Sequence, residues 1–205
     1  MKRTSYSIHR CNSALYGVPV VLKDRLHANL LTFADTEPGL LDYCVYAPSF
    51  IYNNRSGEKE SCYVISAKFD DGHAEVWASS WELEPNSDSA LEQARQGQAK
   101  SLGATYHLFT AKAFAASPIE LKNRQTMQAV LFKGGGFDTT ALEESLDAML
   151  SGTSLSFAAL AEQSQRPLLQ VELASFRLLR DKRLKADMAS RYISPSFQIS
   201  GGCHA

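Results

Sequence analysis

The chain has 205 residues, of which 44% are hydrophobic and 21% are charged. These are ordinary proportions for a soluble globular protein, and the length suits one large domain or two small ones. The 21 Lys and Arg residues nearly balance the 22 Asp and Glu residues, giving a net charge of −1, which excludes capture of nucleic acid by bulk positive charge and requires any such surface to be local.

The cysteines and the N-terminus exclude several other classes. None of the four cysteines (Cys11, Cys44, Cys62 and Cys203) belongs to a C-x-x-C pair, so the zinc-binding spacing is missing. The basic N-terminus lacks the apolar run of a secretory signal, and no apolar stretch approaches the roughly 20 residues that span a bilayer. We therefore expect a cytoplasmic protein with free thiols and no membrane association.

The first half of the chain has the pattern of a small α/β domain. Leu22, Leu26, Leu30 and Phe33 lie at helical spacing, which predicts a helix over 21–34 that ends before Pro38-Gly39. Strands are predicted next, and Asp70-Asp71-Gly72 is a strong hairpin signal between two of them. The predicted strands are 43–52, 62–69, 73–83 and 104–111, with a helix over 88–102 before the last. The order α-β-β-β-α-β indicates a mixed central sheet.

The second half is rich in helix formers and has almost no strand signal until its end. Helices are predicted over 118–132, 139–150, 156–165 and 167–180. Leu184 and Tyr192-Ile193 bracket a short basic hairpin after the last helix. Three helices followed by a basic hairpin are typical of a winged-helix domain.

Together these patterns predict four segments, with the domain boundary near 115–135. They are an N-terminal arm over 1–19, an α/β domain over 20–115, an α-rich winged-helix-like domain over 116–200 and a flexible tail over 201–205.

This succession resembles the TnsA family, the endonuclease subunits of heteromeric, Tn7-like transposases. The resemblance covers roughly 20–199 and rests on element order and on four phrases: AKSLGATYHLFT (99–110), LKNRQTM (121–127), LSFAALAEQ (155–163) and LLRDKRLKADMASRYISPSFQI (178–199). It implies a restriction-endonuclease-like core followed by a winged-helix domain. It also implies that DNA and a transposase or an ATPase regulator are the partners.

The active site of that family needs a helix Glu, a strand Asp and a Glu-x-Lys on the next strand, because carboxylates hold Mg²⁺ and the lysine orients water. In this chain the corresponding positions are His27, Ser66, Ala78 and Ser80. A serine hydroxyl brings no charge and is a poor Mg²⁺ ligand. The resemblance therefore implies a degenerate nuclease that binds no metal or other cofactor and does not cleave DNA.

Two alternatives stay open. An active nuclease with a relocated Mg²⁺ site would use Asp71, Glu75, Glu82 or Glu84, with Lys100 supplying the lysine. A non-DNA, protein-interaction accessory protein would use the winged helix for protein contact alone.

The strongest positive signal is a cluster of six cations at the end of the last predicted helix and in the hairpin: Arg177, Arg180, Lys182, Arg183, Lys185 and Arg191. Such residues contact the phosphate backbone in winged-helix proteins. We expect Arg177 and Arg180 to be exposed, so that replacing both with Ala weakens DNA binding with little loss of stability. The DNA sequence preference and the oligomeric state are not predicted.

Overall fold

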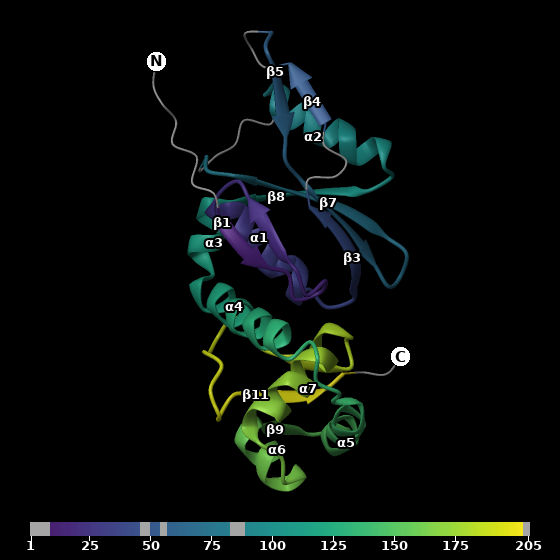
Figure 1. The fold of residues 1–205 in the computed structure, drawn as a ribbon, viewed down its shortest axis with the longest axis vertical. Coiled ribbons are helices and arrows are strands. Elements are labelled where there is room, and N and C mark those ends of the chain that lie inside the picture. The colour runs from purple at the N-terminus through teal and green to yellow at the C-terminus, as the bar shows by residue number, and fades with distance from the viewer. Residues whose placement is uncertain (1–8, 46–49, 54–56, 83–88, 203–205) are drawn as a thin grey trace. The chain divides into compact units, whose positions relative to one another are not determined.

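The chain folds into two compact units in the computed structural model, which describes residues 9–45, 50–53, 57–82 and 89–202 (Figure 1). The first unit comprises residues 9–10, Val21–Ala34 and Leu40–Ala116. The second comprises Cys11–Val20, Asp35–Gly39 and residues 117–202. Each unit has its own buried core.

The first unit is built on a four-stranded mixed sheet with the strand order β3-β6-β7-β8. The strands are β3 (Leu40–Val45), β6 (Ile65–Phe69), β7 (Ala74–Ser80) and β8 (Thr105–Thr110). The first three are antiparallel neighbours, whereas β7 and β8 run parallel. The predicted α/β class with a mixed central sheet is therefore confirmed.

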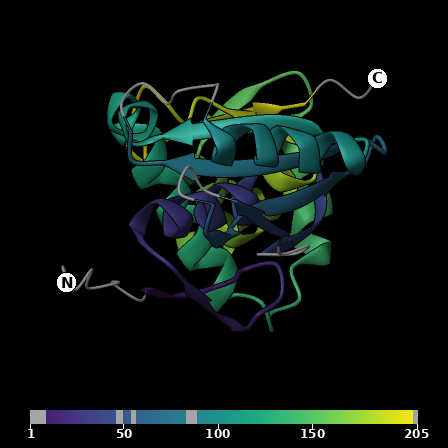
Figure 2. The same ribbon diagram turned by 90° about the horizontal axis from the view of Figure 1, so that it is seen from above.

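Helices cover both faces of this sheet. The three helices of this half are α1 (Arg25–Thr36), α2 (Ala90–Ser101) and α3 (Ala111–Ala116). On one face, Ala99 of α2 packs with Val76 and Ala78 in an apolar cluster. On the other face, Phe109 contacts Trp77, and Phe33 of α1 contacts Phe109. Figure 2 shows α2 beside the strands that it covers.

The ends of α2 follow from local residues. The Ser89 side chain accepts the backbone N–H of Glu92 at 3.2 Å, which caps the first turn. After the helix, Gly103 takes φ +63°, a left-handed conformation that suits glycine and lets the chain turn into β8.

The first predicted strand is wrong in extent. Residues 43–45 belong to β3, which ends at Val45, whereas residues 50–52 belong to β4 (Phe50–Asn53), which pairs with β5 (Lys59–Cys62) in a separate sheet. Residues 46–49 lie outside the described part of the chain. The run of aromatic and branched residues does not indicate where one strand ends and the next begins, because that boundary is set by the strands with which each part pairs. Gly57, two residues before β5, has φ +81°.

The second unit is a helical layer with a small antiparallel sheet. Its helices are α4 (Pro118–Lys133), α5 (Thr140–Leu150), α6 (Phe157–Ser164) and α7 (Leu168–Arg180). The sheet has the order β10-β11-β9, formed by β9 (Ser154–Ser156), β10 (Leu184–Ala186) and β11 (Gln198–Gly201). The helix bounds lie within two residues of the predicted ones.

The predicted hairpin at the end of the chain is partly wrong. β10 starts at Leu184 as expected, but its partner is β11 at Gln198–Gly201 rather than a strand at Tyr192-Ile193. The loop between them is tied down by buried Asn123 of α4, whose side-chain amide donates to the carbonyls of Met188 (2.9 Å) and Arg191 (2.6 Å). Asn123 Oδ1 also accepts the Ile193 N–H at 2.8 Å. Tyr192-Ile193 thus lies in a packed loop.

Residues of the predicted N-terminal arm are ordered. β1 (His9–Asn12) and β2 (Pro19–Leu22) form a two-stranded sheet, and Ser13 is fully buried. Its hydroxyl donates to Asp35 Oδ1 at 3.2 Å. In the predicted tail, β11 extends to Gly201, and residues 203–205 lie outside the described part.

None of the helices in the described ranges is long and apolar enough to cross a membrane.

Candidate functional site

Three of the four positions expected to hold nuclease ligands lie on one face of the sheet, the face that α2 covers. Ser66 pairs with Val76 across β6 and β7, and side chains alternate along a strand. Ser66, Ala78 and Ser80 therefore share the face that α2 covers. Ala78 is completely buried in the apolar cluster with Ala99.

His27 is not brought to that face. It lies on α1, the helix that packs through Phe33 on the opposite side of the sheet. Its backbone N–H (3.0 Å) and its Nδ1 (2.9 Å) both meet Asp24 Oδ1, and the Trp81 indole N–H donates to Asp24 Oδ2 at 3.3 Å. Burial opposes ionisation of Asp24, but these bonds to His27 and Trp81 outweigh it and hold the pKa of the carboxyl well below its usual range. Asp24 caps α1 and orients His27.

A buried polar cluster that the sequence analysis missed lies on the α2 face. Arg95 and Glu92 are both buried and form an ion pair at 3.5 Å, and Arg95 Nη2 donates to the Ser79 carbonyl at 3.1 Å. Burial raises the pKa of the Tyr106 phenol, and the negative charge of nearby Glu92 raises it further. In the sequence, the i, i+3 spacing of Glu92 and Arg95 is the feature that indicates this ion pair, but the same spacing is equally common on exposed helices.

Only some of the acids named for a relocated Mg²⁺ site lie close together. Glu75 Oε1 lies 3.3 Å from Nε2 of both His73 and His107, and Asp71 bonds Nδ1 of His73. The hydrogen bond to Asp71, ahead of the contact with Glu75, raises the pKa of His73. These four exposed or part-exposed side chains form an acid–histidine cluster at the β6–β7 hairpin.

The remaining fallback residues lie elsewhere. Glu82 lies two residues beyond the end of β7, whereas Glu75 is the second residue of that strand, so the two carboxylates are at opposite ends of it. Lys100 is exposed on α2, which covers one face of the sheet. Trp77 lies on the opposite face and donates to Glu75 at 2.6 Å, so Lys100 and Glu75 belong to different faces. Glu84 lies outside the described residues. Within those residues, no group of three or more His, Cys, Asp or Glu is arranged to hold a metal ion.

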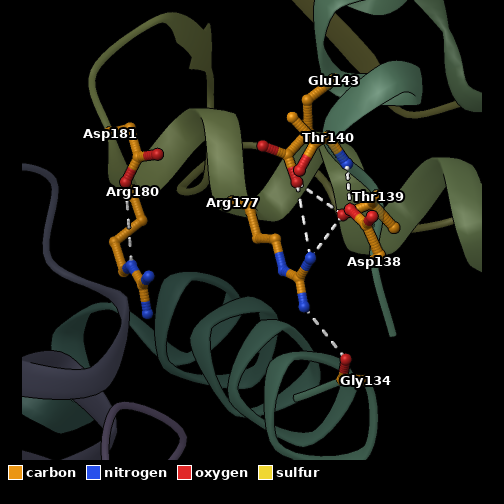
Figure 3. A network of polar contacts seen from close by, with 8 residues as sticks. All are labelled: Gly134, Asp138, Thr139, Thr140, Glu143, Arg177, Arg180 and Asp181. Carbon is orange, nitrogen blue, oxygen red and sulfur yellow. Dashed lines mark hydrogen bonds and ion pairs between the residues drawn. The ribbon is translucent and has the colours of Figure 1, made fainter. Parts of the chain in front are cut away.

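The basic cluster in the second unit does not form one exposed face, because Arg177 is engaged in an internal network (Figure 3). Its Nη2 donates to the Gly134 carbonyl at 3.0 Å, and its Nη1 contacts Thr139 Oγ1 and lies 3.5 Å from Glu143 Oε1. The Arg177 side chain is 22% exposed. The expectation that Arg177 is exposed is therefore wrong, and so is the same expectation for Arg180, whose side chain is 25% exposed. Helical spacing does not predict that the α4–α5 loop contacts α7 at Arg177, and DNA contact by these two residues stays a prediction.

We expect Arg177→Ala to lower the free energy of unfolding by about 1–3 kcal/mol, because it leaves a buried carbonyl and a carboxylate without their charged donor. Urea unfolding followed by circular dichroism would measure this. Arg166→Ala, at an exposed position of the α6–α7 loop, is the matched control and should change stability by less than about 0.5 kcal/mol. Equal stability of the two variants would contradict a structural role for Arg177.

Two other arginines of the cluster lie next to acids. Arg183 donates to Asp147 Oδ2 from Nε (3.2 Å) and Nη2 (2.7 Å), and this bond raises the pKa of the guanidinium. Arg180 Nε lies 4.0 Å from Asp181 Oδ1, and burial raises the pKa of that carboxyl (Figure 3).

The other three predicted cations, Lys182, Lys185 and Arg191, are exposed. Lys182 and Lys185 line a cleft of about 400 Å³ together with Arg124. Its floor is apolar, with Met127 and Leu184 among the lining residues. Arg124 is held at the cleft by Glu37 and Glu120, each at 2.9 Å. We call the exposed cations Lys182, Lys185 and Arg191 the basic surface.

The helix before the basic surface has no open side along its middle. Residues 173–176 of α7 are all buried, and one helical turn contains 3.6 residues, so every direction around the helix is covered there. α4, α5, α6 and β10 all contact α7. A helix enclosed in this way does not present its central side chains to a DNA groove.

Comparison of the sequence with protein-family models gives no match, and comparison with curated proteins gives none either.

Proposed function

We propose that the protein is a non-cleaving, TnsA-like accessory subunit of a transposition system in a mobile element or phage, and that it binds the DNA backbone through its basic surface. The observation that carries this proposal is the order of elements. After α1 the chain forms β3, the separate β4–β5 hairpin, then β6, β7, α2 and β8. With the β4–β5 hairpin treated as an insertion, three antiparallel strands, a helix and a parallel fourth strand match the arrangement that the resemblance implies for a restriction-endonuclease-like core.

The order of elements in the second unit also supports this proposal. After α4, its order is helix, strand, two helices and two strands, with β11 between β9 and β10. This order fits a winged-helix domain in which α7 occupies the place of the third helix and residues 187–197 form the wing. The TnsA resemblance implies a domain of this kind after the nuclease core.

Loss of cleavage is supported by the chemistry at the aligned positions. Ala78 and Ser80 replace a carboxylate and the lysine, and Ser66 replaces the strand carboxylate. Hard cations such as Mg²⁺ require several oxygen ligands, usually including carboxylates. The α2 face holds the apolar side chains of Val76, Ala78 and Ala99 together with the buried Glu92–Arg95 pair, which supports the proposal of a non-cleaving protein.

The mode of DNA contact follows from the enclosure of α7. Because its central turn faces protein on every side, base reading through this helix is disfavoured, and we propose that the exposed cations after it contact the phosphates. Phosphate contacts carry no sequence information directly. We therefore propose salt-sensitive binding with little sequence preference.

We expect a gel shift of plasmid or duplex DNA without metal, and no nicking with Mg²⁺ or Mn²⁺. Three phosphate contacts give a slope of about −3 for log affinity against log salt. A triple variant, Lys182→Ala with Lys185→Ala and Arg191→Ala, should bind at least about tenfold more weakly and have a flatter slope. The matched control replaces three exposed lysines of the first unit, Lys68, Lys100 and Lys112, and should bind as the wild type does.

Other outcomes would select the alternatives. Metal-dependent nicking lost in Glu75→Ala or Glu82→Ala would establish an active nuclease with a relocated Mg²⁺ site. Neither shift nor nicking would favour an accessory protein that contacts only other proteins, the second candidate, which the enclosure of α7 also favours. The partner implied by the resemblance is a transposase or an ATPase regulator.

A further inference from the structure

The second unit has a groove that is separate from the basic surface. It has a volume of about 860 Å³ and is lined by residues of α4, the α4–α5 loop, the start of α5, and the start of α7 with the loop before it. Its lining includes the apolar side chains of Val130, Leu142 and Leu173. Leu173 packs closely against Gly134, which has no side chain, because a Cβ at that position would lie 2.4 Å from Leu173 Cδ1.

Two large apolar side chains of the groove are open to solvent. Phe137 is 67% exposed and Leu169 is 63% exposed, and both line the groove. A small ligand enclosed in the groove would leave these two side chains exposed to water, whereas an extended partner would cover them. Contiguous exposed apolar surface with a polar rim is typical of protein–protein contact sites.

The charges around the groove indicate the nature of the partner. Lys122, Lys133 and Arg166 line it and are exposed. The facing carboxylate is Asp138, whose pKa is lowered mainly by the hydrogen bond from the Thr140 backbone N–H. Three cations therefore surround the apolar lining with one anion, which favours a partner of negative charge.

We infer that this groove is the docking site for an acidic amphipathic segment of a partner protein, with apolar side chains on the groove lining and carboxylates beside Lys122, Lys133 and Arg166. A groove between helices is the usual receptor for a helix with apolar anchors at i, i+3 or i+4, and i+7. The inference goes beyond the proposed function and does not rest on DNA binding.

The test is a selection from a random 16-residue peptide library displayed on phage, using the full chain as bait and Leu169→Glu as the counter-selected bait. The most enriched peptide is then synthesised with a fluorescent label, and its affinity is measured by polarisation. The expected peptides carry net negative charge and apolar residues at helical spacing. Leu169→Ala, and separately Lys133→Glu with Arg166→Glu, should each weaken binding at least tenfold.

Controls separate docking from other effects. Leu102→Ala changes another exposed leucine and should leave the affinity unchanged. Thermal melting followed by circular dichroism should give the same midpoint for Leu169→Ala as for the wild type, because Leu169 is mostly exposed.

Three results would overturn the inference. The first is failure to enrich any peptide over the Leu169→Glu bait. The second is competition of the peptide by a 20-base-pair duplex DNA, with the duplex losing affinity in the charge-reversal variant, which would make the groove a nucleic-acid surface. The third is concentration-dependent self-association of the wild type in sedimentation experiments that Leu169→Ala abolishes, which would make the occupant a second copy of this chain.

Discussion

Phe157→Ala is expected to cost about 3–5 kcal/mol of the free energy of unfolding, the range for removal of a buried aromatic side chain. Phe157 begins α6 and is completely buried. Its ring lies edge-to-face on Phe176 of α7, with 5.6 Å between centroids, and stacks on Phe197 at 5.7 Å. The loss combines transfer of the ring to water, the cavity left behind and two aromatic contacts.

Urea unfolding followed by far-ultraviolet circular dichroism measures this loss, because the longest helix and three others belong to the second unit. The matched control is Phe137→Ala, the same change at a side chain that is 67% exposed, with an expected effect below about 0.5 kcal/mol. Similar midpoints for the two variants would mean that α6 and α7 are not held together by this aromatic contact.

The helices of the second unit were predictable because their signals are local. Ser156 caps α6 by accepting the Ala159 N–H at 3.2 Å, and Pro167 immediately precedes α7. Both positions are readable from the sequence. The small sheet was not equally readable, because β9 and β10 have three residues each and depend on pairing with β11. Strands that short carry almost no periodicity.

The positions of the candidate site residues were less predictable than the elements that carry them. Helical spacing places Arg177 in the last turn of α7 but gives no account of Gly134, 43 positions earlier, whose carbonyl accepts its guanidinium. The pairing of Arg183 with Asp147 is similarly remote in sequence. Composition identifies a basic cluster, while only the tertiary fold shows which cations are used internally.

The sheet of the first unit gives a second instance of this limit. Assigning nuclease ligand positions from the sequence assumes that the helix residue and the strand residues lie on the same face of the sheet. Here Ser66 and Ala78 face α2, and His27 belongs to α1 on the other side. A shift of one residue along a strand reverses the face, and the sequence motif alone does not fix that register.

Asp35→Ala is expected to lower the free energy of unfolding by about 3 kcal/mol, because one buried carboxylate satisfies donors from two separate segments. Asp35 is fully buried near the end of α1. Its Oδ2 accepts the Ala14 N–H and the Gln128 amide, each at 2.7 Å. Its Oδ1 accepts the Leu15 N–H at 3.1 Å.

Removing the carboxylate leaves these donors without an acceptor, and alanine cannot replace either oxygen. Asp35→Asn keeps the shape but turns one acceptor into a donor that faces other donors, so we expect about 2 kcal/mol of loss from that variant as well. Asp42→Ala, at an exposed position of β3, is the control for aspartate removal and should change stability by less than about 0.5 kcal/mol. If Asp35→Asn were as stable as the wild type, the carboxylate would not be the anchor of residues 13–15, and shape alone would hold them to α4. If both Asp35 variants lose stability in the expected order, the segment predicted from sequence as a loose arm is part of the core of the second unit, held by charge and hydrogen bonding where it has few apolar side chains to bury.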